Sequence, residues 1–193
     1  MEFEPNVPYD NLPLLPPSVD VESKAVLKQC LAATRALAEL KGVGSLIPDQ
    51  SILINSIPLQ EAQFSSEIEN IVTTQDELFR AALDESGISD PATKEVFRYR
   101  TALKAGCDII QTQSLSVDLI RNLCRILRGM PEADLRSKNE KVVIGNAFSR
   151  DVIYTPPSGG RKLQTKLRNL EKFMQTKNGI DPLVKMAITH YQE

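Results

Sequence analysis

The chain has 193 residues, of which 41% are hydrophobic, and its formal net charge is -2. A chain of this size and composition can bury a core without help from disulfides. No apolar run approaches the roughly 18 residues of a membrane span, and the acidic, proline-rich start lacks the basic and apolar regions of a signal peptide. We therefore expect one compact domain, or two closely packed ones, in a cytoplasmic protein.

The charge is unevenly divided along the chain. Residues 1–96 hold 16 acidic and 6 basic side chains, whereas residues 97–193 hold 9 acidic and 17 basic ones. Such an asymmetry indicates either two lobes that attract each other or a basic surface offered to an acidic partner. The asymmetry alone does not choose between them.

The three cysteines are Cys30, Cys107 and Cys124, and none belongs to a Cys-x-x-Cys pair. All three lie at apolar positions of helical patterns. This placement favours reduced thiols in the core over metal ligands or disulfides.

The first third of the chain predicts an arm followed by helices. Five prolines within residues 1–17 remove amide donors, so we expect an extended arm packed by Leu12, Leu14 and Leu15. Asp20 can cap a helix that continues to about Lys41 and ends at Gly42. The apolar face of this helix would consist of Val26, Leu27, Cys30, Leu31, Leu37 and Leu40. A short helical stretch is expected after Pro48, and residues 59–70 have helical propensity with a thin apolar stripe.

The rest of the chain predicts further helices around a single hairpin. Apolar residues recur at helical spacing over 74–84, 91–111, 117–128, 161–176 and from 181 to the end. Two short β-branched runs, 141–146 and 152–155, indicate a β-hairpin. The predicted fold class is all-α with one β-hairpin.

This order of elements resembles that of the Fic family of protein adenylyltransferases. Four stretches carry the resemblance: the arm at 12–17, residues 60–70 with Ser65-Ser66-Glu67-Ile68-Glu69-Asn70, the hairpin with Ile144-Gly145 and Tyr154-Thr155-Pro156-Pro157, and Ile188-Thr189-His190-Tyr191-Gln192. The resemblance implies a Fic-type helical bundle with a hairpin flap at 141–155. It also implies an amino-terminal helical region over 1–95 and the first part of a Fic core over 96–193, incomplete at the carboxyl end.

Residues Ser65, Glu69 and Asn70 fit the inhibitory pattern of the family, which is Ser or Thr, three residues, Glu, then Gly or Asn. In the family this glutamate pairs with an arginine of the catalytic motif and blocks productive binding of the ATP γ-phosphate. Ser65 and Glu69 are four residues apart and so share a helix face, where a carboxylate would engage an arginine and repel a triphosphate. The alternative is that Glu67 and Glu69 are ordinary solvated acids.

The hairpin has a family role as a flap that binds a segment of the target protein by strand addition. Main-chain hydrogen bonds at a strand edge align a peptide without reading its sequence. The flap residues implied here are Ile144, Gly145, Ile153, Tyr154 and Thr155. The alternative is a purely structural hairpin that covers the helices.

The family's catalytic motif, His-Pro-Phe-x-x-Gly-Asn-Gly-Arg, does not occur in this sequence. We therefore assign no catalytic or metal-binding residue. The sole histidine, His190, is interpreted as a packing residue, and Gly159-Gly160, too short for a phosphate loop, as turn residues. The resemblance implies ATP and Mg²⁺ for a complete enzyme, but we do not expect this chain alone to bind either tightly.

The leading hypothesis is the amino-terminal regulatory part of a self-inhibited adenylyltransferase. In complete form it would transfer AMP from ATP to a hydroxyl side chain of a target protein, and this chain alone would be inactive. The alternative is a non-enzymatic binding or regulatory protein that uses the hairpin edge or the inhibitory helix.

Partners other than a protein substrate are judged from composition and pattern. Leu183, Met186 and Ala187 of the last helix would be exposed in an incomplete core, which favours a homodimer. We expect no membrane partner. We also expect no nucleic acid on the basic helix, since neither an aromatic platform nor a recognisable motif accompanies its bases. Those bases are Arg161, Lys162, Lys166, Arg168, Lys172 and Lys177.

Overall fold

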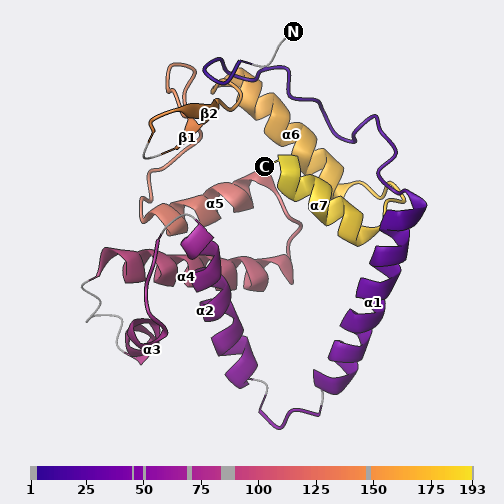
Figure 1. Cartoon of the computed structure of the whole chain (residues 1–193), viewed down its shortest axis with the longest axis vertical. Helices are drawn as coiled ribbons and strands as arrows, with labels where there is room; N and C mark the ends of the chain where they lie inside the picture. The colour runs from indigo at the N-terminus through magenta and orange to yellow at the C-terminus, as the bar shows by residue number, and fades with distance from the viewer. Residues whose placement is uncertain are drawn as a thin grey trace. The chain divides into compact units, whose positions relative to one another are not determined.

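The computed structural model describes residues 4–44, 46–49, 51–68, 71–83, 90–146 and 149–192. Within these ranges the chain forms helices and one two-stranded antiparallel hairpin (Figure 1), which confirms the predicted fold class. The elements in chain order are α1 (Lys24–Gly44), α2 (Ser51–Ile68), α3 (Gln75–Leu83), α4 (Pro91–Ile110), α5 (Val117–Arg128), β1 (Ile144–Gly145), β2 (Val152–Tyr154), α6 (Arg161–Gln175) and α7 (Pro182–Gln192).

The chain divides into two compact units, which are described separately. Unit 1 consists of Met1–Ala33 and Leu135–Glu193, and unit 2 consists of Thr34–Asp134. Unit 1 is thus built from both ends of the chain. The predicted division at residue 95 followed the organisation of the family and stays a prediction.

The core of unit 2 lies between α2, α3 and α4. It consists of Leu59, Ala62, Leu78, Ala81, Val96 and Phe97. The sequence predicted two separate helical pieces before residue 70, but the structure has one continuous helix with Pro58 inside it. Proline removes one helical hydrogen bond, and the burial of Leu59 and Ala62 against the neighbouring helices outweighs that cost.

Polar side chains fix the beginnings of α3 and α4. Thr74 and Glu77 form a capping box. The Thr74 amide donates to the Glu77 carboxylate at 3.1 Å, and the Glu77 amide donates to the Thr74 hydroxyl at 3.2 Å. The Asp90 carboxylate accepts from the amide and the hydroxyl of Thr93, both at 2.7 Å. A buried hydrogen bond of 2.7 Å between Thr73 and Thr93 then joins the two helix starts.

Helices α4 and α5 pack closely through a glycine. A Cβ on Gly106 would lie 3.2 Å from a Leu123 methyl group, so this crossing leaves little room for a side chain. Cys107 and Cys124 lie on these helices but are exposed, so the prediction of core thiols is wrong for both. Helical periodicity alone could not show which apolar positions face the neighbouring helix and which lie at the edge of that face.

In unit 1 the proline-rich arm lies along α6 (Figure 1). Asn169 accepts from the Leu15 amide at 2.7 Å and donates to the Leu15 carbonyl at 2.9 Å. Gln192 of α7 donates to the Pro13 carbonyl at 3.0 Å. Leu12 and Leu15 are half-buried while Leu14 is exposed, so two of the three predicted leucines pack.

Helix α1 begins three residues later than predicted. Ser23 rather than Asp20 caps it, since the Val26 amide donates to the Ser23 hydroxyl at 3.4 Å. Only Cys30 of the predicted apolar face is buried. Burial raises the pKa of the Cys30 thiol, and the carboxylates of Asp181 and Glu22 raise it further.

Helix α7 buries Val184 and exposes His190. The interpretation of His190 as a packing residue is therefore wrong, because the inner face of this helix is set by Val184 and the half-buried Ile188. The expected exposure is confirmed for Met186 and Ala187, whereas Leu183 is half-buried.

Candidate functional site

The hairpin is a short ribbon fixed by its turn. Ile144 pairs with Tyr154 and Gly145 with Val152, with an irregular register between them. A Cβ on Gly145 would lie 2.6 Å from the Asp151 carbonyl, so glycine allows the two strands to approach here. The Asn146 amide closes the turn by donating to the same carbonyl at 3.0 Å. All five predicted flap residues lie together, although Thr155 follows β2 instead of belonging to it.

The arm covers the end of β2. The Tyr9 amide donates to the Thr155 carbonyl at 2.9 Å, and the Thr155 hydroxyl donates to the Pro5 carbonyl at 2.6 Å. The rings of Tyr9 and Tyr154 meet edge to face with centroids 6.3 Å apart. Thr155 is consequently 2% exposed. Sequence reasoning missed this contact, because nothing local to Thr155 identifies a partner about 150 residues away.

The outer side of β1 is open by contrast. Val142, Val143 and Ile144 are 41%, 43% and 55% exposed. Within the described ranges, no backbone hydrogen bond from outside the hairpin reaches residues 141–145. A short β-branched segment with unpaired main-chain groups is the kind of edge to which another strand can be added.

Beneath the hairpin lies a cavity of about 330 Å³, lined by Ile144, Tyr154, Pro157, Leu167, Leu170 and Tyr191 among others. Burial raises the pKa of the Tyr154 phenol, the neighbouring tyrosines raise it further, and Arg136 opposes them. Tyr154 therefore stays a neutral hydrogen-bonding group at physiological pH. The surroundings of the hairpin are mainly apolar.

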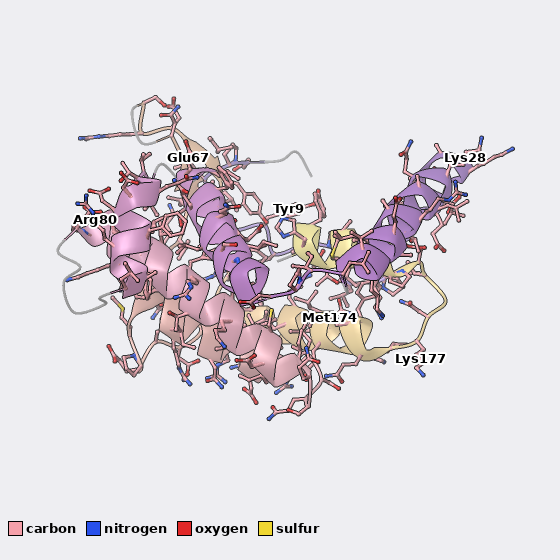
Figure 2. The ribbon with its side chains drawn as sticks, turned by 90° about the horizontal axis from the view of Figure 1, so that it is seen from below. Tyr9, Lys28, Glu67, Arg80, Met174 and Lys177 are labelled. Atoms are coloured by element: carbon pink, nitrogen blue, oxygen red, sulfur yellow. The ribbon has the colours of Figure 1, made fainter. Side chains whose placement is uncertain are left out.

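The inhibitory pattern begins on α2. Leu59, Ala62 and Ser66 are buried, and the helix packs against α4. Ser65, the first predicted inhibitory residue, is half-buried beside this face. Glu67 is exposed and projects from the carboxyl end of α2 (Figure 2). Glu69 and Asn70 lie outside the described residues, so their inhibitory assignment stays a prediction.

The segment after the pattern is anchored as well. The Ile71 amide donates to the Ser66 carbonyl at 3.0 Å, and the Gln63 side chain donates to the Thr73 carbonyl at 3.1 Å. Residues on both sides of positions 69 and 70 are thus fixed to unit 2.

The described part of the chain contains neither a metal site nor a membrane helix. No group of three or more His, Cys, Asp or Glu side chains within the described ranges is arranged to bind a metal ion. None of the described helices combines the length and apolar character that crossing a membrane requires.

A comparison with protein families finds a match to an internal range of the chain. Residues 27–108 match the family model described as Fic/DOC family N-terminal. Over this range the chain is similar to the amino-terminal region of Fic family proteins. The matched range includes α2 and the Ser65-Ser66-Glu67-Ile68 stretch at its end.

Proposed function

We propose that this chain is the regulatory and target-binding portion of a self-inhibited Fic protein adenylyltransferase. The observation that carries the proposal is the position of the inhibitory pattern, which lies inside the family match and begins on a helix packed into unit 2. The complete enzyme would transfer AMP from ATP to a hydroxyl side chain of a target protein, with Mg²⁺ on the phosphates. Without the His-Pro-Phe-x-x-Gly-Asn-Gly-Arg motif this polypeptide lacks the base and the phosphate-binding loop, so it does not catalyse the transfer by itself.

Glu69 acts in this proposal as the inhibitory carboxylate. A carboxylate paired with the motif arginine removes a partner of the γ-phosphate and places a like charge beside it. Inhibition then ends when the carboxylate is removed.

The hairpin provides the target-binding edge, and the structure favours β1 over β2 for this role. The Tyr9 amide of the arm already donates to the Thr155 carbonyl that follows β2, whereas the outer side of residues 141–145 is open. A target segment in extended form would pair with β1 and place its hydroxyl residue by register.

Labelled AMP transfer tests the inhibitory assignment. We would compare this chain with a version extended by the codons that follow it in the gene, each with Glu69 intact and as Glu69→Gly. We expect strong labelling of cell proteins only from the extended Glu69→Gly variant, and none from the present chain. Glu67→Gly is the matched control, because Glu67 is an exposed acid that lies two positions before Glu69 in the sequence. Equal labelling with and without Glu69 would refute the latch.

A second pair of variants tests the hairpin edge in the extended, activated protein. Val143→Pro removes one main-chain donor next to β1 without entering the strand pair, and Val143→Ala keeps the donor. We expect Val143→Pro to reduce labelling of target proteins while Val143→Ala retains it. If both variants label targets alike, β1 is not the docking edge. If the extended chain is inactive but binds cell proteins through this edge, the chain functions as a non-enzymatic binding protein.

A further inference from the structure

A second pocket in unit 1 is rich in positive charge. It has a volume of about 600 Å³ and lies where the arm, the loop after Leu135 and the start of α6 meet. Its charged lining residues are Lys138, Arg161, Lys162, Lys166 and Asp10. Four cationic side chains thus share one cavity with a single carboxylate.

A glycine turn brings these cations together. A Cβ on Gly159 would lie 2.1 Å from the Ser137 carbonyl oxygen, so only glycine permits this approach. The Gly160 amide donates to the Arg136 carbonyl at 3.1 Å, and Arg136 donates to the Pro157 carbonyl at 2.7 Å. Lys138, in the loop before the hairpin, is thereby held beside the start of α6.

Two of the four cations have their charge already engaged. Lys162 pairs with Asp10, and Lys166 donates to the Leu12 carbonyl. Within the described part of the chain, Lys138 and Arg161 make no side-chain hydrogen bond or ion pair. Helix α6 also begins without a side-chain cap, which leaves its first amides for another acceptor.

Asp10 shows what the pocket does to an anion. Its carboxylate accepts from the Ser158 amide at 2.8 Å, from the Ser158 hydroxyl at 3.1 Å and from Lys162. Burial alone would raise the pKa of Asp10, but the bonds from Lys162 and Ser158 lower it overall. A backbone amide, a hydroxyl and an ammonium group are also the donors that phosphate oxygens take.

We propose that this pocket binds a diphosphate group through Lys138, Arg161 and Lys162, next to the place that Asp10 occupies. The cavity offers more cationic donors and more volume than a single phosphate requires, which favours a diphosphate. The group comes either free or as part of a nucleotide, since both present the same oxygens. The inference does not depend on the proposed function.

Isothermal titration calorimetry with inorganic pyrophosphate, carried out at low and at moderate salt, tests the site. We expect saturable binding with one pyrophosphate per chain. Lys138→Gln combined with Arg161→Gln should weaken it at least about tenfold, since two charge-assisted contacts are lost. Arg168→Gln combined with Lys172→Gln removes the same charge from α6 outside the pocket, and should change the affinity by less than about threefold. Circular dichroism confirms that both variants fold.

Asp10→Asn gives a test of opposite sign. The amide still accepts from Ser158 but no longer competes for Lys162 by charge, so pyrophosphate should bind several-fold more tightly. A parallel titration with ADP distinguishes a free diphosphate from the diphosphate of a nucleotide. Saturable binding of either probe supports the site, and the probe that binds more tightly indicates which form the pocket prefers. Absence of saturable binding with both probes would overturn the proposal. So would equal weakening by the two double variants, which would indicate only a diffuse positive field.

Discussion

At the scale of single residues, a few side chains and glycines hold segments that lie far apart in the sequence. Thr73 and Thr93 join two helix starts through one buried hydrogen bond, and Gly159 lets two loops touch through their backbones. Such positions allow little substitution, because a neighbouring backbone cannot move as a flexible side chain can. Two predictions belong at this scale.

Gly159→Ala should destabilise unit 1 by about 1–3 kcal/mol, the usual cost of overpacking. Its new methyl group would meet two backbone carbonyls, those of Arg136 and Ser137, at 2.4 and 2.1 Å. Gly42→Ala is the control, because nothing lies within 4 Å of a Cβ there and α1 should gain up to about 1 kcal/mol. Urea unfolding measures both. Equal stabilities for the two variants would show that the loops part without cost.

Asp90 should make the stability of unit 2 depend on pH. Hydrogen bonds from the Thr93 side chain and amide lower the pKa of Asp90 below its ordinary value of 3.8. Its contribution is therefore complete above that value and is lost as the pH falls through the lower pKa of the folded state. Asp90→Ala should be less stable than the parent at neutral pH, and the gap should narrow below about pH 4. A pH-independent gap in urea unfolding would contradict this account.

At the scale of elements, α3 illustrates how a short helix depends on one face. Leu78 is 1% exposed within the core of unit 2, and its neighbour Phe79 is 49% exposed. Leu78→Ala should cost about 2–5 kcal/mol through lost burial and the cavity left behind. Phe79→Ala should change stability by only about 0.5 kcal/mol. Thermal or urea unfolding compares the two, and a larger loss for Phe79→Ala would place the packed face of α3 elsewhere.

The elements also show where sequence reasoning succeeded. Helix α5 was predicted with its observed bounds, because apolar residues recur regularly along it. In the structure Ser116 caps this helix and Gly129 ends it with a φ of 62°. The continuity of α2 through Pro58 could not be predicted, because it depends on packing against α3 and α4. The exposure of Cys107, Cys124 and His190 could not be predicted either, because it also depends on packing. A periodic pattern identifies a helix more reliably than the face it buries.

The candidate site divides in the same way. The hairpin residues were predictable from β-branched runs and the turn between them. The cover that Pro5 and Tyr9 place over Thr155 was not, because it joins segments about 150 residues apart. The assignment of Glu69 rests on the family pattern, since that position lies outside the described residues.

At the scale of the whole molecule, Asn169 ties the arm to α6. Its side chain makes two hydrogen bonds to the backbone of Leu15, at 2.7 and 2.9 Å. Asn169→Ala should weaken the docking of the arm by about 1–3 kcal/mol, since each bond contributes about 0.5–1.5 kcal/mol. Hydrogen exchange at the Leu15 amide should then accelerate at least about tenfold. Gln164→Ala, at an exposed position of the same helix, is the control and should leave this amide protected. Unchanged exchange in Asn169→Ala would show that other contacts hold the arm.

The construction of unit 1 from two distant stretches also sets an order of events during synthesis on the ribosome. Unit 2 has all its residues once position 134 has emerged, whereas the arm waits for Asn169 and Gln192 before its backbone finds partners. Unit 2 should therefore fold first, while the proline-rich arm, which has already emerged, still lacks its partners. During that interval the prolines should protect the nascent chain from incorrect β-pairing. A segment with few amide donors can form few main-chain hydrogen bonds with another strand.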